Sequence, residues 1–182
     1  MKKISLIGVF AAVTAICSWI NIPLFFTPVP VNLALIGPYA AGCLLGSRSG
    51  FLSQIVYIML GLLGIPVFAG FTGGAAVLAG PTGGFIAGYA VCALICGAYS
   101  RRGLRFRGLS DLSRAAAFMT AGLLACYGLG LLWYMAVTGS SLWSGLIACV
   151  LPFLPGDAVK IACAVLLCRR LWPVVSSFTA ES

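Results

Sequence analysis

The sequence predicts an all-α integral membrane protein, with six transmembrane helices in one domain over residues 1–182. Hydrophobic residues make up 62% of the chain and charged residues only 8%, spread over its whole length, which excludes a water-soluble globule. A crossing needs about 20 apolar residues, so the length allows six helices with short loops and no extramembrane domain. Clusters of Pro, Gly and Arg place these helices near residues 4–20, 31–46, 50–64, 83–99, 115–137 and 144–168. Five crossings are the alternative count.

The first segment also resembles a secretory signal, because Lys2 and Lys3 precede its apolar stretch. We interpret it as a retained helix, since the stretch is long, further spans follow it, and Ile16 rather than a small residue precedes Cys17. The later segments are divided by loops that contain Pro and Gly. The fourth segment ends at a cluster of arginines, the fifth begins after that cluster, and the sixth ends before Arg169.

Basic residues predict which ends of the helices face the cytoplasm. The loops at 21–30, 65–82 and 138–143 contain no charged residue. The alternate connections and the two termini carry Lys2, Lys3, Arg48, Arg101, Arg102, Arg105, Arg107, Arg114, Arg169 and Arg170. The positive-inside rule therefore predicts that both termini are cytoplasmic. Topology and contact with anionic lipid headgroups account for the net charge of +8, and no basic stripe remains for a nucleic acid.

Asp157 and Lys160 are the two charged residues expected inside the membrane. A charge there costs roughly 2.5–3.5 kcal/mol, so the pair indicates a binding site for a small polar solute. At positions i and i+3 the two side chains share a helical face and can neutralise each other. The alternative is a salt bridge that only locks the last helix.

Residues 65–84 are glycine-rich and contain Thr-Gly-Gly twice. The stretch is apolar between its glycines, so we expect a structured loop that dips into the bundle. Gly80-Pro81-Thr82 would open the fourth helix, where free N–H groups suit a carboxylate or a ureido-type carbonyl. Tight turns needed only for packing are the alternative. No Gly-Lys-Ser/Thr follows the glycines, so this stretch is not an ATP-binding P-loop, and energy from ATP would have to come from a partner.

The eight cysteines lie within or at the ends of apolar segments, His is absent, and there is no Cys-x-x-Cys. We interpret the cysteines as small apolar residues at helix interfaces and predict no metal site. The lack of His also disfavours an intramembrane enzyme; a serine protease would need Ser18 or Ser53 as nucleophile and Lys160 as base.

Two pairs of small residues lie on the first helix, Gly8 with Ala12 and Ala11 with Ala15. Such pairs allow another helix to approach closely, either within the bundle or from a partner protein. Gly84 and Gly88 on the fourth helix form a similar pair, which we expect to pack internally.

Four separated stretches resemble the BioY family, the biotin-specific S components of energy-coupling-factor (ECF) transporters. They are FTPVP at 26–30, GIPVFAG at 64–70, GPTGGF at 80–85, and LPFLPGDAVK at 151–160. The resemblance implies a six-helix S-component fold that captures biotin from outside. It also implies a complex with a transmembrane coupling protein and two ATPases, in which the loaded subunit topples in the membrane. The small residues of the first helix would contact the coupling protein.

The resemblance also implies roles for single residues. Asp157 and Lys160 match the family's Asp-x-x-Lys and would contact the polar ends of biotin, Lys160 as a donor and Asp157 as an acceptor. Which end each residue holds stays open. Lid, wall and cavity positions would be Phe68, Gly70, Gly73, Gly74, Thr82 and Tyr89. Asn32-Leu33-Ala34 stands where the family has Thr-Leu-Gln; Asn32 can still hydrogen-bond to a ligand, whereas Ala34 cannot.

Two other function classes remain open at this point. One is a self-sufficient secondary transporter, in which the Asp157–Lys160 pair exchanges protons, and the other is a membrane enzyme. A pore is disfavoured, because one charged pair among six helices offers no continuous polar path. We expect a multi-pass protein of a prokaryotic plasma membrane.

Overall fold

The computed structural model describes the chain except residues 1, 23–30, 102–105, 107 and 181–182. Its helices are α1 (Lys2–Trp19), α2 (Ile36–Leu45), α3 (Ser47–Leu62), α4 (Ala75–Ala79), α5 (Gly83–Arg101), α6 (Leu109–Thr138), α7 (Leu142–Cys149) and α8 (Leu154–Ala180). The predicted helical architecture is confirmed. The described residues also form a short antiparallel ladder, in which β1 (Asn21–Ile22) pairs with β2 (Val31–Asn32).

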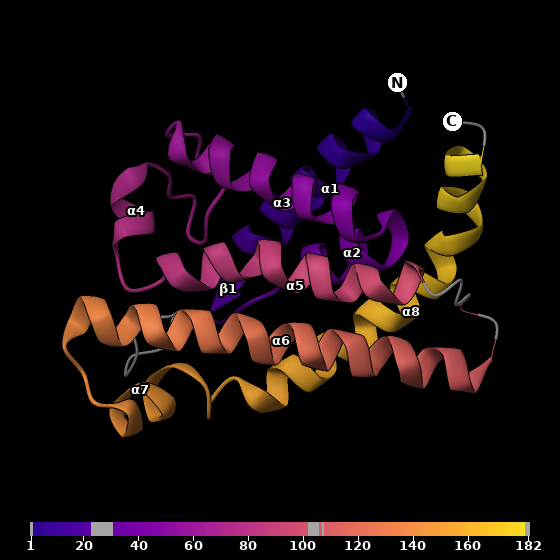
Figure 1. The fold of residues 1–182 in the computed structure, drawn as a ribbon. Coiled ribbons are helices and arrows are strands. Elements are labelled where there is room, and N and C mark those ends of the chain that lie inside the picture. The colour runs from indigo at the N-terminus through magenta and orange to yellow at the C-terminus, as the bar shows by residue number, and fades with distance from the viewer. Residues whose placement is uncertain (1, 23–30, 102–105, 107, 181–182) are drawn as a thin grey trace.

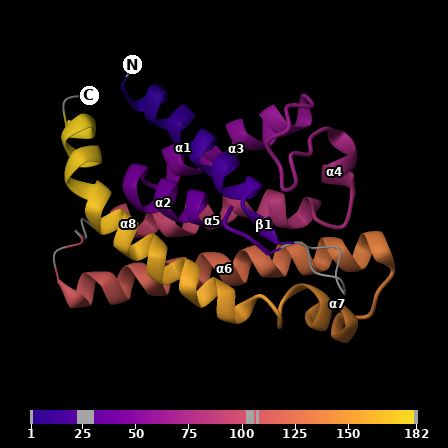
Figure 2. The ribbon, with the colours of Figure 1, turned by 180° about the vertical axis from the view of Figure 1, so that it is seen from behind.

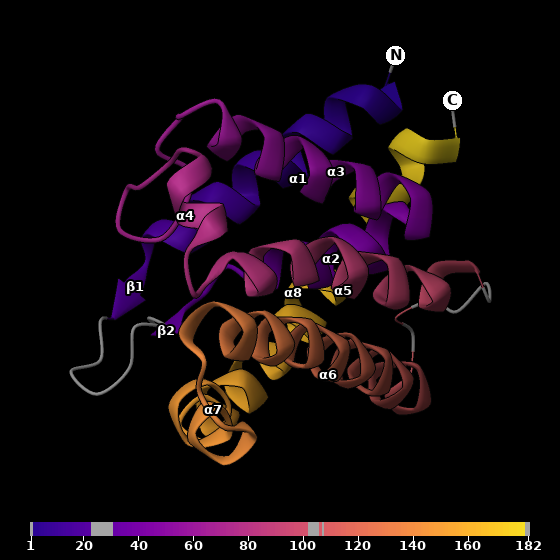
Figure 3. The ribbon, with the colours of Figure 1, turned by 60° about the vertical axis from the view of Figure 1, so that its left-hand side comes forward.

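The helices form a bundle in which α5 lies between two groups of elements. Figure 1 shows α1, α2 and α3 on one side of α5 and α6 on the other, while α8 crosses behind. The view from behind shows α8 crossing α6 obliquely towards the end where both termini lie (Figure 2). The short helices α4 and α7 lie at the opposite end of the bundle (Figures 1 and 3).

Small residues allow the central helices to approach closely. A Cβ added to Gly97 would lie 2.1 Å from the Ser47 backbone nitrogen, and one added to Gly50 would lie 2.8 Å from the Gly42 Cα. On the other side of α5, a Cβ on Gly88 would meet the Cys126 Sγ at 2.8 Å. Close helix crossings of this kind require glycine. The expected internal packing of Gly88 is therefore confirmed.

The second and sixth segments differ from their predicted bounds. Residues 31–32 belong to β2, and Asn32 Oδ1 accepts a hydrogen bond from the Ala34 N–H at 3.1 Å, a local turn that competes with helix. The sixth segment is broken into α7 and α8, which are bent by 52°. Pro152 lies in the break, where it has no N–H to donate and disfavours a helical conformation for Leu151.

α8 also continues beyond its predicted end at residue 168, to Ala180. Arginine is a good helix former, so Arg169 and Arg170 do not end the helix. Trp172 packs against Phe106, with ring centroids 5.7 Å apart, and this contact supports the extension.

Among the described helices, α5 and α6 are long and apolar enough to cross a membrane singly, and α7 with α8 adds a third crossing if the bent pair is one span. The helix over Lys3–Trp19 and α2 are apolar but shorter. Six crossings therefore stay a prediction.

Candidate functional site

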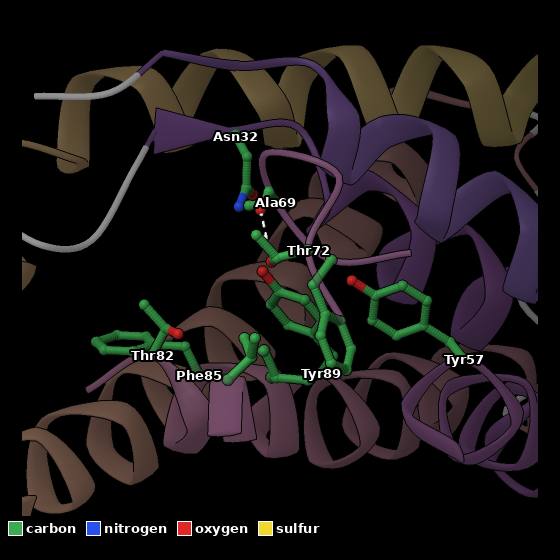
Figure 4. Close-up of a pocket in the computed structure, with 10 residues that line it drawn as sticks. Asn32, Tyr57, Ala69, Thr72, Thr82, Phe85 and Tyr89 are labelled. Atoms are coloured by element: carbon green, nitrogen blue, oxygen red, sulfur yellow. Dashed lines mark hydrogen bonds between the residues drawn. The ribbon is translucent and has the colours of Figure 1, made fainter. Parts of the chain in front are cut away.

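A cavity of about 310 Å³ lies near the α4 end of the bundle. It is lined by Asn32, Tyr57, Phe68, Ala69, Thr72, Val77, Thr82, Phe85, Ile86 and Tyr89. In Figure 4 the Asn32 side chain reaches from β2 towards Ala69 and Thr72, opposite the rings of Tyr57 and Tyr89. The volume is at the lower end of the range of small-molecule sites, roughly 300–1,000 Å³. We call this space the aromatic chamber.

A smaller pocket of about 50 Å³ adjoins the chamber and shares Asn32, Phe85 and Tyr89 with it. Its other lining residues are Leu35, Cys126, Tyr127, Cys149, Phe153, Asp157 and Lys160. We call this space the polar recess. Together the two spaces offer apolar rings at one end and a charged pair at the other.

The charged pair is buried and closely coupled. Lys160 Nζ donates to Asp157 Oδ1 at 2.6 Å, and the two residues are 5% and 1% exposed. The Tyr127 hydroxyl donates to the other carboxylate oxygen, Asp157 Oδ2. Either charge alone would be costly at this depth, so the pairing stabilises both. The predicted neutralisation of the two charges is confirmed.

The triad of Asp157, Lys160 and Tyr127 still has hydrogen-bonding capacity for a ligand. An ammonium group carries three donors, of which Lys160 uses one on Asp157. A carboxylate has about four lone-pair sites, and Lys160 and Tyr127 occupy two of them. Asp157 also lies in the first turn of α8, where the helix dipole favours a negative charge.

Three aromatic side chains form a continuous wall of the chamber. Tyr57 from α3 meets Phe68 edge-on, with ring centroids 5.5 Å apart, and lies 6.3 Å from the ring of Tyr89 on α5. All three rings are less than 10% exposed. Such a wall suits a compact apolar ring system, which binds rigid aromatic surfaces at little cost in side-chain entropy.

Residues 63–74, which we call the lid, fold back into the bundle as the sequence predicts. Phe68 is only 1% exposed, its N–H donates to the Thr72 carbonyl at 2.9 Å, and the Gly74 N–H donates to the Gly61 carbonyl at 2.7 Å. The remaining part of the glycine-rich stretch contains the short helix α4, which was not predicted.

The three predicted lid glycines shape the lid but line neither pocket. Gly70 and Gly74 have φ of +69° and +96°, which favour glycine. A Cβ on Gly73 would lie 2.5 Å from the Ile65 carbonyl oxygen. They lie in the lid as expected, where they turn the backbone, and their contact with a ligand stays a prediction. Thr82, by contrast, lines the chamber and precedes α5.

Sequence reasoning missed several lining residues, among them Tyr57, Phe85 and Tyr127. The sequence could have indicated Tyr127, because a phenol inside an apolar helix needs a hydrogen-bond partner. The charged residues expected inside the membrane, Asp157 and Lys160, are the natural candidates. No sequence feature marks Tyr57 or Phe85 as lining residues, because aromatic residues are common throughout apolar spans. The stretch at 26–30, used in the sequence comparison, lies outside the described residues.

The small residues of α1 divide between two faces. Ala11 and Ala15 are 1% and 6% exposed and pack inside the bundle, so their predicted place in a partner interface is wrong. Gly8 and Ala12 are exposed, and a Cβ on Gly8 would meet nothing within 4 Å. Of the four residues predicted to contact a partner, Gly8 and Ala12 are therefore the two that remain candidates.

The arrangement needed for a serine protease is not formed by Ser18, Ser53 and Lys160. Ser18 Oγ donates to the Val67 carbonyl at 2.6 Å, and Ser53 Oγ to the Gly50 carbonyl at 2.7 Å, while Lys160 is paired with Asp157. Neither hydroxyl donates to the lysine that would have to act as base.

Comparisons with known proteins agree over nearly the full length of the chain. A family model described as "BioY family" matches residues 1–177. A probable biotin transporter BioY of Pyrococcus horikoshii is 39% identical over 170 residues, which cover 93% of this chain and 96% of the relative. A biotin transporter BioY of Thermotoga maritima is 33% identical over 174 residues, covering 94% and 96%.

One solved structure is also similar in fold. The crystal structure of the S-component for biotin from an ECF-type ABC transporter matches with a TM-score of 0.82 and 29% identity. The match covers 93% of this chain and 90% of that chain.

Proposed function

Because this chain belongs to the BioY family, we propose that it is the biotin-binding S component of an ECF-type importer, which captures biotin from outside and delivers it across the membrane. It is a multi-pass membrane protein of a prokaryote and not an enzyme. The observation that carries the proposal beyond family membership is the aromatic chamber that adjoins the polar recess with Asp157 and Lys160.

The chemistry of biotin fits these two spaces. Its fused ring system is compact and contains a thioether sulfur, which makes favourable contacts with aromatic rings such as Tyr57, Phe68 and Tyr89. Its ureido group needs both donors and acceptors, and its carboxylate needs donors. Lys160 supplies N–H groups, and Asp157 can accept from a ureido N–H in a charge-assisted bond.

Asn32 and Tyr127 complete the proposed set of polar contacts. Asn32 lines both spaces, its Oδ1 accepts from the Ala34 N–H, and its side chain also hydrogen-bonds with Tyr89. An amide group carries two N–H donors, so a second one can serve the ligand. Tyr127 lines the recess and fixes the Asp157 carboxylate. Thr82 contributes a hydroxyl to the chamber wall.

We infer the orientation in the membrane from the position of the basic residues. The two termini lie at the same end of the bundle (Figure 1), and Arg48 at the α2–α3 corner belongs to the same basic set. Positively charged ends favour the cytoplasmic side. With six crossings and cytoplasmic termini, the α4 end and the aromatic chamber face outward, where biotin is captured.

Energy for transport comes from other subunits in this proposal. The sequence has no Gly-Lys-Ser/Thr P-loop, and the similar S-component comes from an ECF-type ABC transporter. The proposed partners are a transmembrane coupling protein and two ATPases. The exposed Gly8/Ala12 face of α1 is the proposed contact with the coupling protein, since small residues permit close approach of another helix.

Titration calorimetry of the purified chain with biotin tests the proposal, with desthiobiotin, thiamine and riboflavin as comparators and no partner present. We expect binding of biotin and of its close analogue only. Absence of binding to all four ligands would contradict the biotin assignment. Biotin uptake into vesicles that lack any ATPase would instead favour a self-sufficient secondary transporter.

A further inference from the structure

The C-terminal end of α1 fastens the lid through two hydrogen bonds to consecutive lid residues. Ser18 Oγ donates to the Val67 carbonyl at 2.6 Å, and Trp19 Nε1 donates to the Pro66 carbonyl at 2.8 Å. The Trp19 ring also stacks on Phe71, with centroids 5.0 Å apart. The two hydrogen bonds join residues 49 and 47 positions apart in the sequence. The lid is therefore tied to a helix that is remote from it along the chain.

The other fastenings of the lid are local. The N–H groups of Gly64, Ile65 and Gly74 donate to carbonyls at the end of α3, the helix from which the lid emerges. The Leu63 N–H likewise donates to the Met59 carbonyl of α3, whereas the bonds from the Val67 N–H to the Ile65 carbonyl and from the Phe68 N–H to the Thr72 carbonyl close turns within the lid. In the described part of the chain, Ser18 and Trp19 thus supply the side-chain hydrogen bonds that tie the lid to a helix other than α3.

The fastened residues lie next to Phe68, which forms part of the chamber wall. Phe68 directly follows Val67, the acceptor of the Ser18 bond. Ser18 itself is 1% exposed, so water cannot readily replace its bond, whereas Trp19 is partly exposed. Releasing the Ser18 contact would free the backbone that holds Phe68 over a ligand.

We propose that Ser18 and Trp19 form a latch that holds the lid shut over bound biotin. They act as positioning residues and set how long the ligand stays in the chamber. The inference rests on the proposed function, because the lifetime it concerns is that of bound biotin. α1 thereby has two roles on two faces: it fastens the lid through its last turn and exposes Gly8 and Ala12 on its surface.

The test measures dissociation of radiolabelled biotin from the purified full chain after a chase with excess unlabelled biotin. Ser18→Ala and Trp19→Phe each remove one donor, and Trp19→Phe keeps a ring that can stack on Phe71. One hydrogen bond changes an equilibrium by about twofold to tenfold, so we expect each variant to release biotin faster by a factor in this range. The double variant should release it faster than either single variant, with association rates unchanged.

Ser53→Ala is the matched control, because Ser53 is a buried serine of α3 whose hydroxyl donates to a backbone carbonyl of its own helix. Ser53→Ala and Ser18→Ala should lower the unfolding temperature of the ligand-free chain to a similar degree, but only Ser18→Ala should speed release. Wild-type release rates in both latch variants, or equal acceleration by Ser53→Ala, would overturn the latch. Failure of the wild-type chain to bind biotin would contradict the proposed function instead.

Discussion

At the scale of single residues, the proposed binding site is organised by one carboxylate. Asp157 accepts from Lys160 on one oxygen and from Tyr127 on the other, and these three residues come from α6 and α8. The Asp157 carboxylate therefore holds the Lys160 side chain in position beside the recess, and the Tyr127 hydroxyl holds the carboxylate. The arrangement keeps two opposite charges in an apolar bundle and directs their unused hydrogen-bonding capacity towards a ligand.

Removing either member of the ion pair should weaken biotin binding. Asp157→Ala leaves Lys160 charged and unpaired in the bundle, and Lys160→Ala does the same to Asp157. We expect at least a tenfold rise in the dissociation constant in each variant, measured by calorimetry, because each change strands a buried charge and also deletes a hydrogen-bonding group for biotin. Unchanged binding in both variants would assign the pair to structure alone.

The Tyr127 hydroxyl should matter to binding although its ring is only one part of the recess. Tyr127→Phe keeps the ring and deletes the donor to Asp157, and bonds to charged groups contribute about 1.5–3 kcal/mol. We expect biotin to bind about tenfold more weakly. Tyr134→Phe is the control on the same helix, since Tyr134 is buried but outside the lining of both pockets. Equal losses in the two variants would show that the effect is not specific to Asp157.

At the scale of elements, the lid is held by close packing as well as by hydrogen bonds. Gly61, near the end of α3, lies directly under Phe68, where an added Cβ would come within 2.0 Å of the ring. The Gly61 carbonyl also accepts from the Gly74 N–H at 2.7 Å. Gly61 thus determines how closely Phe68 packs on α3 and also anchors the end of the lid at Gly74.

Gly61→Ala should therefore displace Phe68 and damage the chamber. Overpacking of this kind costs about 1–3 kcal/mol, so we expect a lower unfolding temperature and weaker biotin binding. Gly128→Ala on α6 is the control, because a Cβ there meets nothing within 4 Å, and Ala is favoured over Gly in a helix by about 0.5–1 kcal/mol. Loss of binding in the control, or none in Gly61→Ala, would contradict this packing argument.

The element scale also shows what the sequence could and could not predict. Charge in an apolar segment identified Asp157 and Lys160, because its cost in a membrane is independent of the fold. Apolar composition identified the long helices but not their interruptions: residues 31–32 pair as a strand, and Pro152 separates α7 from α8. Short apolar runs are compatible with strand and helix alike, so the difference is settled by tertiary contacts.

At the scale of the whole molecule, the proposed sites of biotin binding and of coupling are separated in space. The aromatic chamber lies near the α4 end, whereas the two termini lie at the opposite end of the bundle (Figure 1). Both proposed functions involve α1, through Ser18 and Trp19 at its C-terminal end and through the exposed Gly8 and Ala12 nearer its N-terminus. Substitutions on the Gly8/Ala12 face should consequently affect assembly with the coupling protein without affecting biotin binding.

Ala12→Leu tests this separation. Ala12 is exposed, so a leucine there is tolerated by the isolated chain, which should bind biotin with wild-type affinity in calorimetry. The larger side chain would prevent close approach of a partner helix at the Gly8/Ala12 face, so the chain should no longer copurify with the coupling protein and the two ATPases. Ala121→Leu makes the same change at an exposed position of α6 and should leave the complex intact. Retention of the complex by Ala12→Leu would place the coupling surface on another face, whereas loss of biotin binding would mean that this face of α1 also supports the lid.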